Sequence, residues 1–123
     1  MTAPAVPPGW PGEVRPPGAP DWERSAVAWL LDLCPPDYRA YEVLRRHPIV
    51  LAHLATRHVE AGIDGAKRGI GTARRDLRDL VDTATIEAAL AAYEREGARL
   101  VVTARSVGLV ADALRGKRYV PRL

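Results

Sequence analysis

Residues 49–114 read IVLAHLATRHVEAGIDGAKRGIGTARRDLRDLVDTATIEAALAAYEREGARLVVTARSVGLVADAL, and apolar or small side chains recur in them at alternating spacings of four and three. In the first half, the recurring positions are Ile49, Ala52, Thr56, Val59, Ile63, Ala66, Ile70, Ala73, Leu77 and Leu80. In the second half, they are Ile86, Leu90, Tyr93, Gly97, Leu100, Ala104, Val107, Ala111 and Leu114. This alternation is typical of coiled-coil seams between helices that lie along one another.

Only residues 81–83 separate the two series, and so short a link forces the helices to run antiparallel. Folding the chain back about Asp82 places Ala73 opposite Tyr93 and Ala66 opposite Leu100, so that a large side chain meets a small one at each level. We therefore predict an all-α fold built on a long antiparallel helical hairpin of residues 48–80 and 83–115. Each arm is about 50 Å long at 1.5 Å per residue.

The chain before the hairpin predicts two short helices and an extended arm. An apolar stripe through residues 22–34 indicates one helix, which Pro35 and Pro36 end, and a second is expected over residues 37–46. Both are expected to pack at the open end of the hairpin. Residues 1–20 are rich in proline and glycine and form an extended or disordered arm, residues 21–116 one helical domain, and residues 117–123 a short basic tail. The arm is mobile, lays Trp10 on the bundle, or serves as a proline-motif ligand.

Composition indicates one domain with no redox or membrane role. The chain has 123 residues, 47% of them hydrophobic, and a net charge of +3 that permits an anionic partner without requiring one. Cys34 is the single cysteine, so an intrachain disulfide is excluded. No basic segment followed by an apolar run marks a signal peptide, and the longest apolar stretch, residues 26–31, is too short to span a bilayer. We expect a cytoplasmic protein without membrane contact.

Small residues in the first arm form the candidate self-association surface. Each glycine inside a helix costs about 1 kcal/mol relative to alanine. The first arm contains four glycines, at positions 62, 65, 69 and 71, and their presence therefore needs an explanation. Three explanations remain open: close packing with a second subunit, close packing within the chain, or a helix break near Gly69 and Gly71. The residues that would form a surface for a second subunit are Ala55, Gly62, Gly65 and Gly69.

Basic residues supply a second candidate surface. Two clusters are available for phosphate contacts, one on the first arm and one in the tail: Lys67, Arg68, Arg74, Arg75 and Arg78, and then Lys117, Arg118 and Arg122. Asp64, Asp76 and Asp79 interleave with the first cluster, and Arg74 can reach Glu94 across the hairpin. No aromatic side chain lies among these arginines to stack on bases. A solvated helix face and a phosphate-binding face are both compatible with this pattern.

The sequence offers no catalytic, cofactor or metal motif. His53 and His58 are five residues apart, so they do not converge on one metal ion. Cys34 ends an apolar helix and is expected to be buried and inert. Residues 69–74 carry two glycines of a dinucleotide fingerprint but lack the third and the preceding strand. Residues 62–65 match the GxxG loop of KH modules, whose sheet is not predicted.

Three distinctive segments carry a resemblance: PGWPGEVRPPG at residues 8–18, WLLDLCPPDYR at residues 29–39 and RYVPRL at residues 118–123. Together they resemble a group of small all-helical proteins of high-GC actinobacteria, to which no function is attached. The resemblance extends over most of the chain. It implies a bacterial cytoplasmic setting and transfers no activity, cofactor or site residue.

These observations favour a non-enzymatic protein–protein interaction or structural module. We expect it to self-associate through the hairpin as a dimer or tetramer, or to bind another protein, without a cofactor. The alternative is a small nucleic-acid-associated protein that contacts phosphates through Arg68, Arg75, Arg78 and the basic tail.

Overall fold

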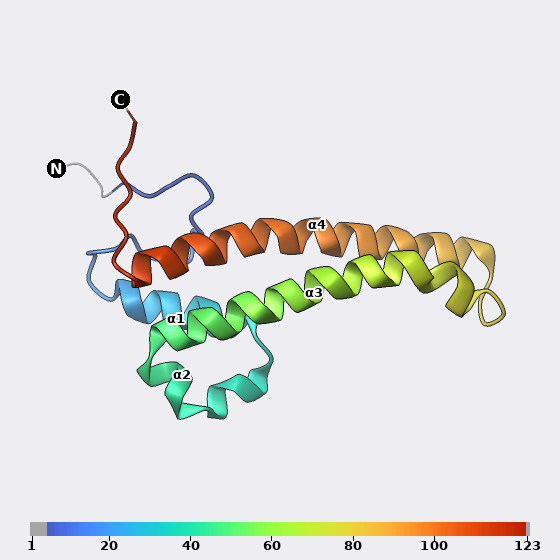
Figure 1. Cartoon of the computed structure of the whole chain (residues 1–123), viewed down its shortest axis with the longest axis horizontal. Coiled ribbons are helices and arrows are strands. Elements are labelled where there is room, and N and C mark those ends of the chain that lie inside the picture. The colour runs from blue at the N-terminus through green and yellow to red at the C-terminus, as the bar shows by residue number, and fades with distance from the viewer. Residues whose placement is uncertain (1–4, 123) are drawn as a thin grey trace.

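The computed structural model describes residues 5–122; the first four residues of the predicted arm and Leu123 of the predicted tail lie outside the described residues. In it α1 spans Trp22–Leu33, the 3-10 helix η1 Pro36–Ala40, α2 Glu42–Arg46, α3 Pro48–Leu77 and α4 Thr83–Leu114. The two long helices α3 and α4 run antiparallel, side by side, and the short helices pack at their open end (Figure 1). The predicted all-α fold with a long helical hairpin is therefore confirmed.

The hairpin turn lies slightly earlier than predicted. α3 ends at Leu77 rather than near residue 80, so the link is residues 78–82 instead of residues 81–83. At the start of α4, Asp82 Oδ1 accepts a hydrogen bond from the Thr85 N–H (2.8 Å), which satisfies one of the free donors of the first turn. Gly116, with φ +90°, follows the end of α4 in a left-handed conformation that glycine adopts without strain.

The earlier turn changes which residues meet across the hairpin. Gly62 lies against Leu100, and Gly69 lies against Tyr93. Both pairs are centred on Val81, two residues before Thr83, which is the midpoint of the predicted pairs Ala66–Leu100 and Ala73–Tyr93. The predicted register is therefore wrong by about one helical turn, although the predicted alternation of large and small side chains is present.

The buried stripe of α3 also differs from the predicted seam. Ile49, Ile70 and Leu80 of the predicted seam are exposed. The helix is rotated by roughly 40° at 100° per residue, which turns its small residues toward α4 in their place. The predicted seam is confirmed at Ala52, Val59, Ala66 and Ala73, which are buried, and Ala55, Gly62 and Gly69 complete the stripe. On α4 the predicted seam is confirmed at Ile86, Leu90 and Val107.

Buried side chains form two clusters of unequal size. The larger lies at the open end, where Leu30 of α1 and Leu44 of α2 meet Leu51 of α3 and Val110 of α4. The smaller lies toward the hairpin turn and consists of Ala73, Ile86 and Leu90, with Leu77 packed against them. Hydrophobic burial therefore anchors the broad end of the molecule, and the far half of the hairpin projects from it as a thin arm.

The segment expected as one helix over residues 37–46 consists of two pieces. Tyr41 has extended backbone (φ −86°, ψ 103°) and separates η1 from α2. A 3-10 turn fits directly after Pro35 and Pro36, because the first residues of a helix do not need the N–H that proline lacks. The break at Tyr41 redirects the chain so that Leu44 is buried in the main core.

The proline-rich arm packs on the helices over its described part. Val14 is buried in the main core, and Trp10 packs against the same cluster. The Ser106 hydroxyl donates to the Gly9 carbonyl (2.8 Å), which ties the arm to α4. This packing agrees with the alternative in which the arm lays Trp10 on the bundle.

Candidate interaction face of the hairpin

Two of the four glycines of α3, Gly62 and Gly69, face α4 of the same chain. A Cβ built on Gly62 would lie 2.9 Å from Leu100 Cδ1, and one built on Gly69 would lie 2.5 Å from Tyr93 Cε1. Ala55 is fully buried in the main core. Close packing within the chain thus explains these three residues, and they do not form the predicted surface for a second subunit. Gly65 differs, since a Cβ there would meet open space.

Heptad spacing places a second row of side chains beside the seam on each long helix. The row on α3 consists of Ile49, Thr56, Ile63 and Ile70, and the row on α4 consists of Glu87, Glu94, Val101 and Gly108. Residues seven apart differ by only about 20° around a helix. Arg74 follows Ile70 by one turn and forms an ion pair with Glu87, so the two rows border the same side of the hairpin.

The short helix α1 covers the opposite side. Leu51 lies eleven residues before Gly62 and therefore on the glycine side of α3, and it is buried together with Leu30 of α1. On the side of the two rows, the exposed fractions are 53% for Ile49, 38% for Ile70 and 50% for Val101. We call the two rows the open face. Sequence reasoning did not find it, because the predicted rotation of α3 placed Ile49 and Ile70 inside the hairpin.

Both helices carry charged side chains along the open face. Lys67 and Arg74 flank the row on α3 together with Glu60, which lies seven residues before Lys67, whereas Glu87 and Glu94 belong to the row on α4. The Glu87 carboxylate accepts a hydrogen bond from Arg74 and raises the pKa of that guanidinium. This pair replaces the predicted Arg74–Glu94 contact, because the observed register brings Arg74 closer to the start of α4.

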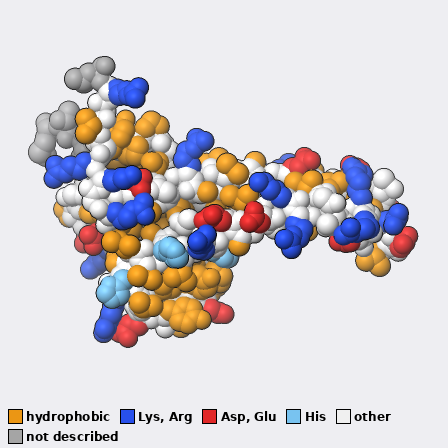
Figure 2. Space-filling view, viewed as in Figure 1, with side chains coloured by type: hydrophobic (Ala, Val, Ile, Leu, Met, Phe, Trp, Pro, Cys, Tyr) orange, Lys and Arg blue, Asp and Glu red, His pale blue; other side chains and the backbone are white. Residues whose placement is uncertain are grey.

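The predicted phosphate-contacting residues do not form one surface. The cluster on α3 lies toward the hairpin turn and the tail lies at the open end, at opposite ends of the molecule (Figure 1). Basic and acidic side chains alternate along the projecting arm, whereas hydrophobic ones gather over the broad end (Figure 2). Arg75 pairs with Asp76 (3.2 Å), and Lys117 Nζ lies 3.9 Å from Asp112 Oδ1. Within residues 5–122, Arg68 and Arg78 form no ion pair.

Cys34 and the histidines do not assemble into a reactive site. Cys34 is buried, and burial raises the pKa of its thiol, although the charge of Arg39 opposes this shift. The thiol therefore stays protonated at neutral pH, and the nucleophilic thiolate is scarce. His58 packs edge-on against Tyr38, with ring centroids 6.2 Å apart. Among the described residues no three His, Cys, Asp or Glu side chains are grouped closely enough to hold a metal ion.

None of the helices in residues 5–122 has the length and hydrophobicity needed to cross a membrane. No protein-family model, no curated protein and no solved structure matches the chain.

Proposed function

We propose that this chain is a non-enzymatic interaction module that self-associates through the open face, with two hairpins packing into a four-helix arrangement. The observation that supports it is the row of exposed apolar side chains, led by Ile49, Ile70 and Val101, on the side away from α1. Complete burial of an isoleucine or valine side chain contributes about 1.5–3 kcal/mol, so even partial burial of this row stabilises a complex.

The charges along the open face favour a second copy as the partner. In a two-fold arrangement whose axis runs along the helices, the same surface of each subunit meets the other, and the row on α3 lies over the row on α4. Lys67 of one subunit then approaches Glu94 of the partner subunit, which pairs unlike charges on both sides of the axis. Within the described residues neither side chain has an ion-pair partner in its own chain.

The small core in the far half of the hairpin supports the same proposal. The cluster near the turn has three buried residues, Ala73, Ile86 and Leu90. Helices receive most of their stability in proteins from packing of an apolar face rather than from propensity. A second hairpin laid on the open face would add such packing along the part of the molecule that has least of it.

Oligomer mass measured by light scattering on a size-exclusion column tests this proposal. We expect a dimer or tetramer for the unchanged chain and a monomer for the double variant Ile70→Glu/Val101→Glu. The matched control is Val102→Glu, because Val102 is 66% exposed and lies one turn before Ser106, which contacts the arm on another side. A monomeric unchanged chain, or equal masses for the double variant and the control, would contradict the proposal.

Nucleic-acid association is retained as a second proposal, supported by the exposed Arg68 and Arg78, which have no ion pair in the described part of the chain. It predicts an absorbance ratio typical of bound nucleic acid on the same column at low salt, with binding that weakens steeply toward physiological salt. A clean protein spectrum together with no shift of a labelled duplex or RNA at about 50 mM salt would remove it. For either function we propose a cytoplasmic setting, on the sequence grounds given above.

A further inference from the structure

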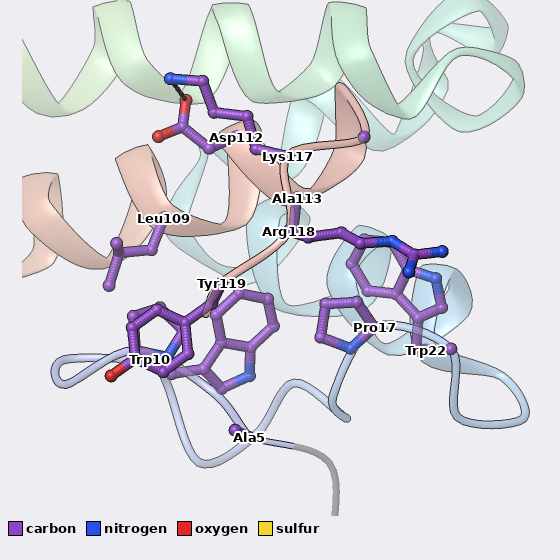
Figure 3. Close-up of a pocket in the computed structure, with 13 residues that line it drawn as sticks. Ala5, Trp10, Pro17, Trp22, Leu109, Asp112, Ala113, Lys117, Arg118 and Tyr119 are labelled. Atoms are coloured by element: carbon purple, nitrogen blue, oxygen red, sulfur yellow. Dashed lines mark ion pairs between the residues drawn. The ribbon is translucent and has the colours of Figure 1, made fainter. Parts of the chain in front are cut away.

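A cavity of about 570 Å³ lies at the broad end of the molecule, between the described start of the arm, the tail and the last turns of α4. Its walls are mainly apolar and aromatic. They include Trp10 and Pro17 from the arm, Trp22 from α1, Leu109 from α4 and Tyr119 from the tail (Figure 3). This volume is typical of small-molecule sites, which are commonly lined by aromatic side chains with few polar groups.

One hydrogen bond fixes a position in each wall of the cavity. Trp10 Nε1 donates to the Val14 carbonyl (2.8 Å), and Val14 is itself buried in the main core. On the tail side, the Lys117 N–H donates to the Asp112 carbonyl (3.0 Å), so the chain turns back over the end of α4 directly after Gly116. The arm and the tail therefore form the two walls without a ligand.

The charge around the cavity is positive. Asp112 is the acidic residue in its lining, and its carboxylate is compensated by ion pairs with Arg115 and Lys117. Arg118 also lines the cavity and has no ion pair within residues 5–122. Figure 3 shows its side chain extending from the tail toward the side of Trp22. One guanidinium is thus available at the mouth of an aromatic-walled cavity.

We infer that the cavity binds a small molecule with a flat apolar body and a single negative charge, such as an aromatic carboxylate. The apolar body would lie among Trp10, Trp22 and Tyr119, where aromatic faces offer a large contact area. The carboxylate would receive hydrogen bonds from Arg118, whose planar guanidinium matches a carboxylate in geometry. This inference is independent of self-association through the open face.

Isothermal titration calorimetry of the full chain with 2-naphthoate tests the inference. We expect saturable binding below about 1 mM, and binding at least tenfold weaker for the cationic analogue 2-naphthylmethylamine. Arg118→Glu is expected to weaken naphthoate binding by roughly tenfold or more. The matched control Arg122→Glu makes the same change of charge in the same tail, but Arg122 does not line the cavity.

Three results would overturn the inference. They are the lack of saturable naphthoate binding, equal affinity for the anionic and cationic probes, and equal weakening by Arg118→Glu and Arg122→Glu. A second pair of variants tests the aromatic wall. Tyr119→Ala should weaken binding severalfold, whereas Val120→Ala, at an exposed tail position outside the lining, should not. Circular dichroism checks that all four variants keep their helices.

Discussion

Gly69 of α3 lies directly against the ring of Tyr93 on α4, so closely that a Cβ on Gly69 would come within 2.5 Å of both Cε1 and Cζ of the tyrosine. The glycine is therefore required by a side chain of the same chain. Tyr93 and Leu100 occupy the space that larger residues of α3 would need, and the two long helices approach closely as a result.

Gly69→Ala is expected to destabilise the protein. Alanine gains about 1 kcal/mol of helix propensity, but the added methyl group must displace the Tyr93 ring, and overpacking typically costs 1–3 kcal/mol. We expect a net loss of up to about 2 kcal/mol in urea unfolding. Combining Gly69→Ala with Tyr93→Ala should recover part of this loss. Strictly additive effects would show that the two residues do not interact.

Gly65→Ala is expected to have the opposite sign. A Cβ at Gly65 meets open space, so the substitution should stabilise α3 by up to about 1 kcal/mol through helix propensity alone. Gly71→Ala should stabilise α3 in the same way, because a Cβ at Gly71 also meets open space. Urea unfolding measures both changes, and equal destabilisation at Gly65 and Gly69 would contradict the packing described for α3.

Val14→Ala tests whether the proline-rich arm contributes to the core. Val14 is 3% exposed, and removing two buried methyl-sized groups costs about 1–2 kcal/mol. Urea unfolding should show this loss, whereas Val6→Ala, at a half-buried position earlier in the arm, should cost less. An unchanged stability for Val14→Ala would mean that the arm does not pack on the helices in solution.

Asp82→Ala is expected to lower the melting temperature at neutral pH but not in strong acid. Hydrogen bonding from Thr85, first from its side chain and then from its backbone N–H, lowers the pKa of the Asp82 carboxyl. Because the unfolded state binds this proton more readily, the stabilisation is present above about pH 4 and is lost as the pH falls through the folded-state pKa. Thermal melts at neutral pH and near pH 2 measure the effect of Asp82→Ala. The control is Asp79→Ala, which removes the same charge from the link without removing a cap. Equal effects of the two substitutions at neutral pH would rule out the cap.

Cys34 is expected to react slowly with iodoacetamide in the native protein. Its thiol is buried with a raised pKa, so both access and the thiolate fraction are low. We expect alkylation at pH 8 to be at least about tenfold slower than in denaturant, as followed by mass spectrometry. The raised pKa also means that the unfolded state releases this proton more readily. The free energy of unfolding is therefore expected to fall as the pH rises above about 8.5. Rapid native alkylation would contradict the burial.

The hairpin can be predicted from sequence because its two helices and their short link are encoded locally. A 4–3 periodicity and the capping residue Asp82 identify the helices, and the structure places both long helices within a few residues of their predicted bounds. The register follows from where α3 ends, and the final turn of a helix is set by weak local preferences. A difference of three residues at Leu77 is accompanied by a shift of about one turn in the contacts of Leu100 and Tyr93 with α3.

The rotation of α3 was not predictable from hydrophobicity alone. Ile63 and Ile70 are more apolar than Gly62 and Gly69, so a hydrophobic pattern assigns the isoleucines to the interior. In the structure the glycines face α4 instead, because the close approach of α4 requires positions without side chains. The cavity at the broad end was also missed, since it joins Trp10 and Tyr119 from opposite ends of the sequence.

Both described ends of the chain emerge at the broad end of the molecule, while the hairpin turn projects away from them (Figure 1). α3 has 30 residues and thus carries the turn about 45 Å from its own first residue. An affinity tag attached beyond either described end therefore leaves the hairpin turn free. Protein immobilised through such a tag would present the hairpin turn outward to partners in solution. A fluorophore attached at Leu80 would report on the far half of the hairpin without disturbing the chain ends.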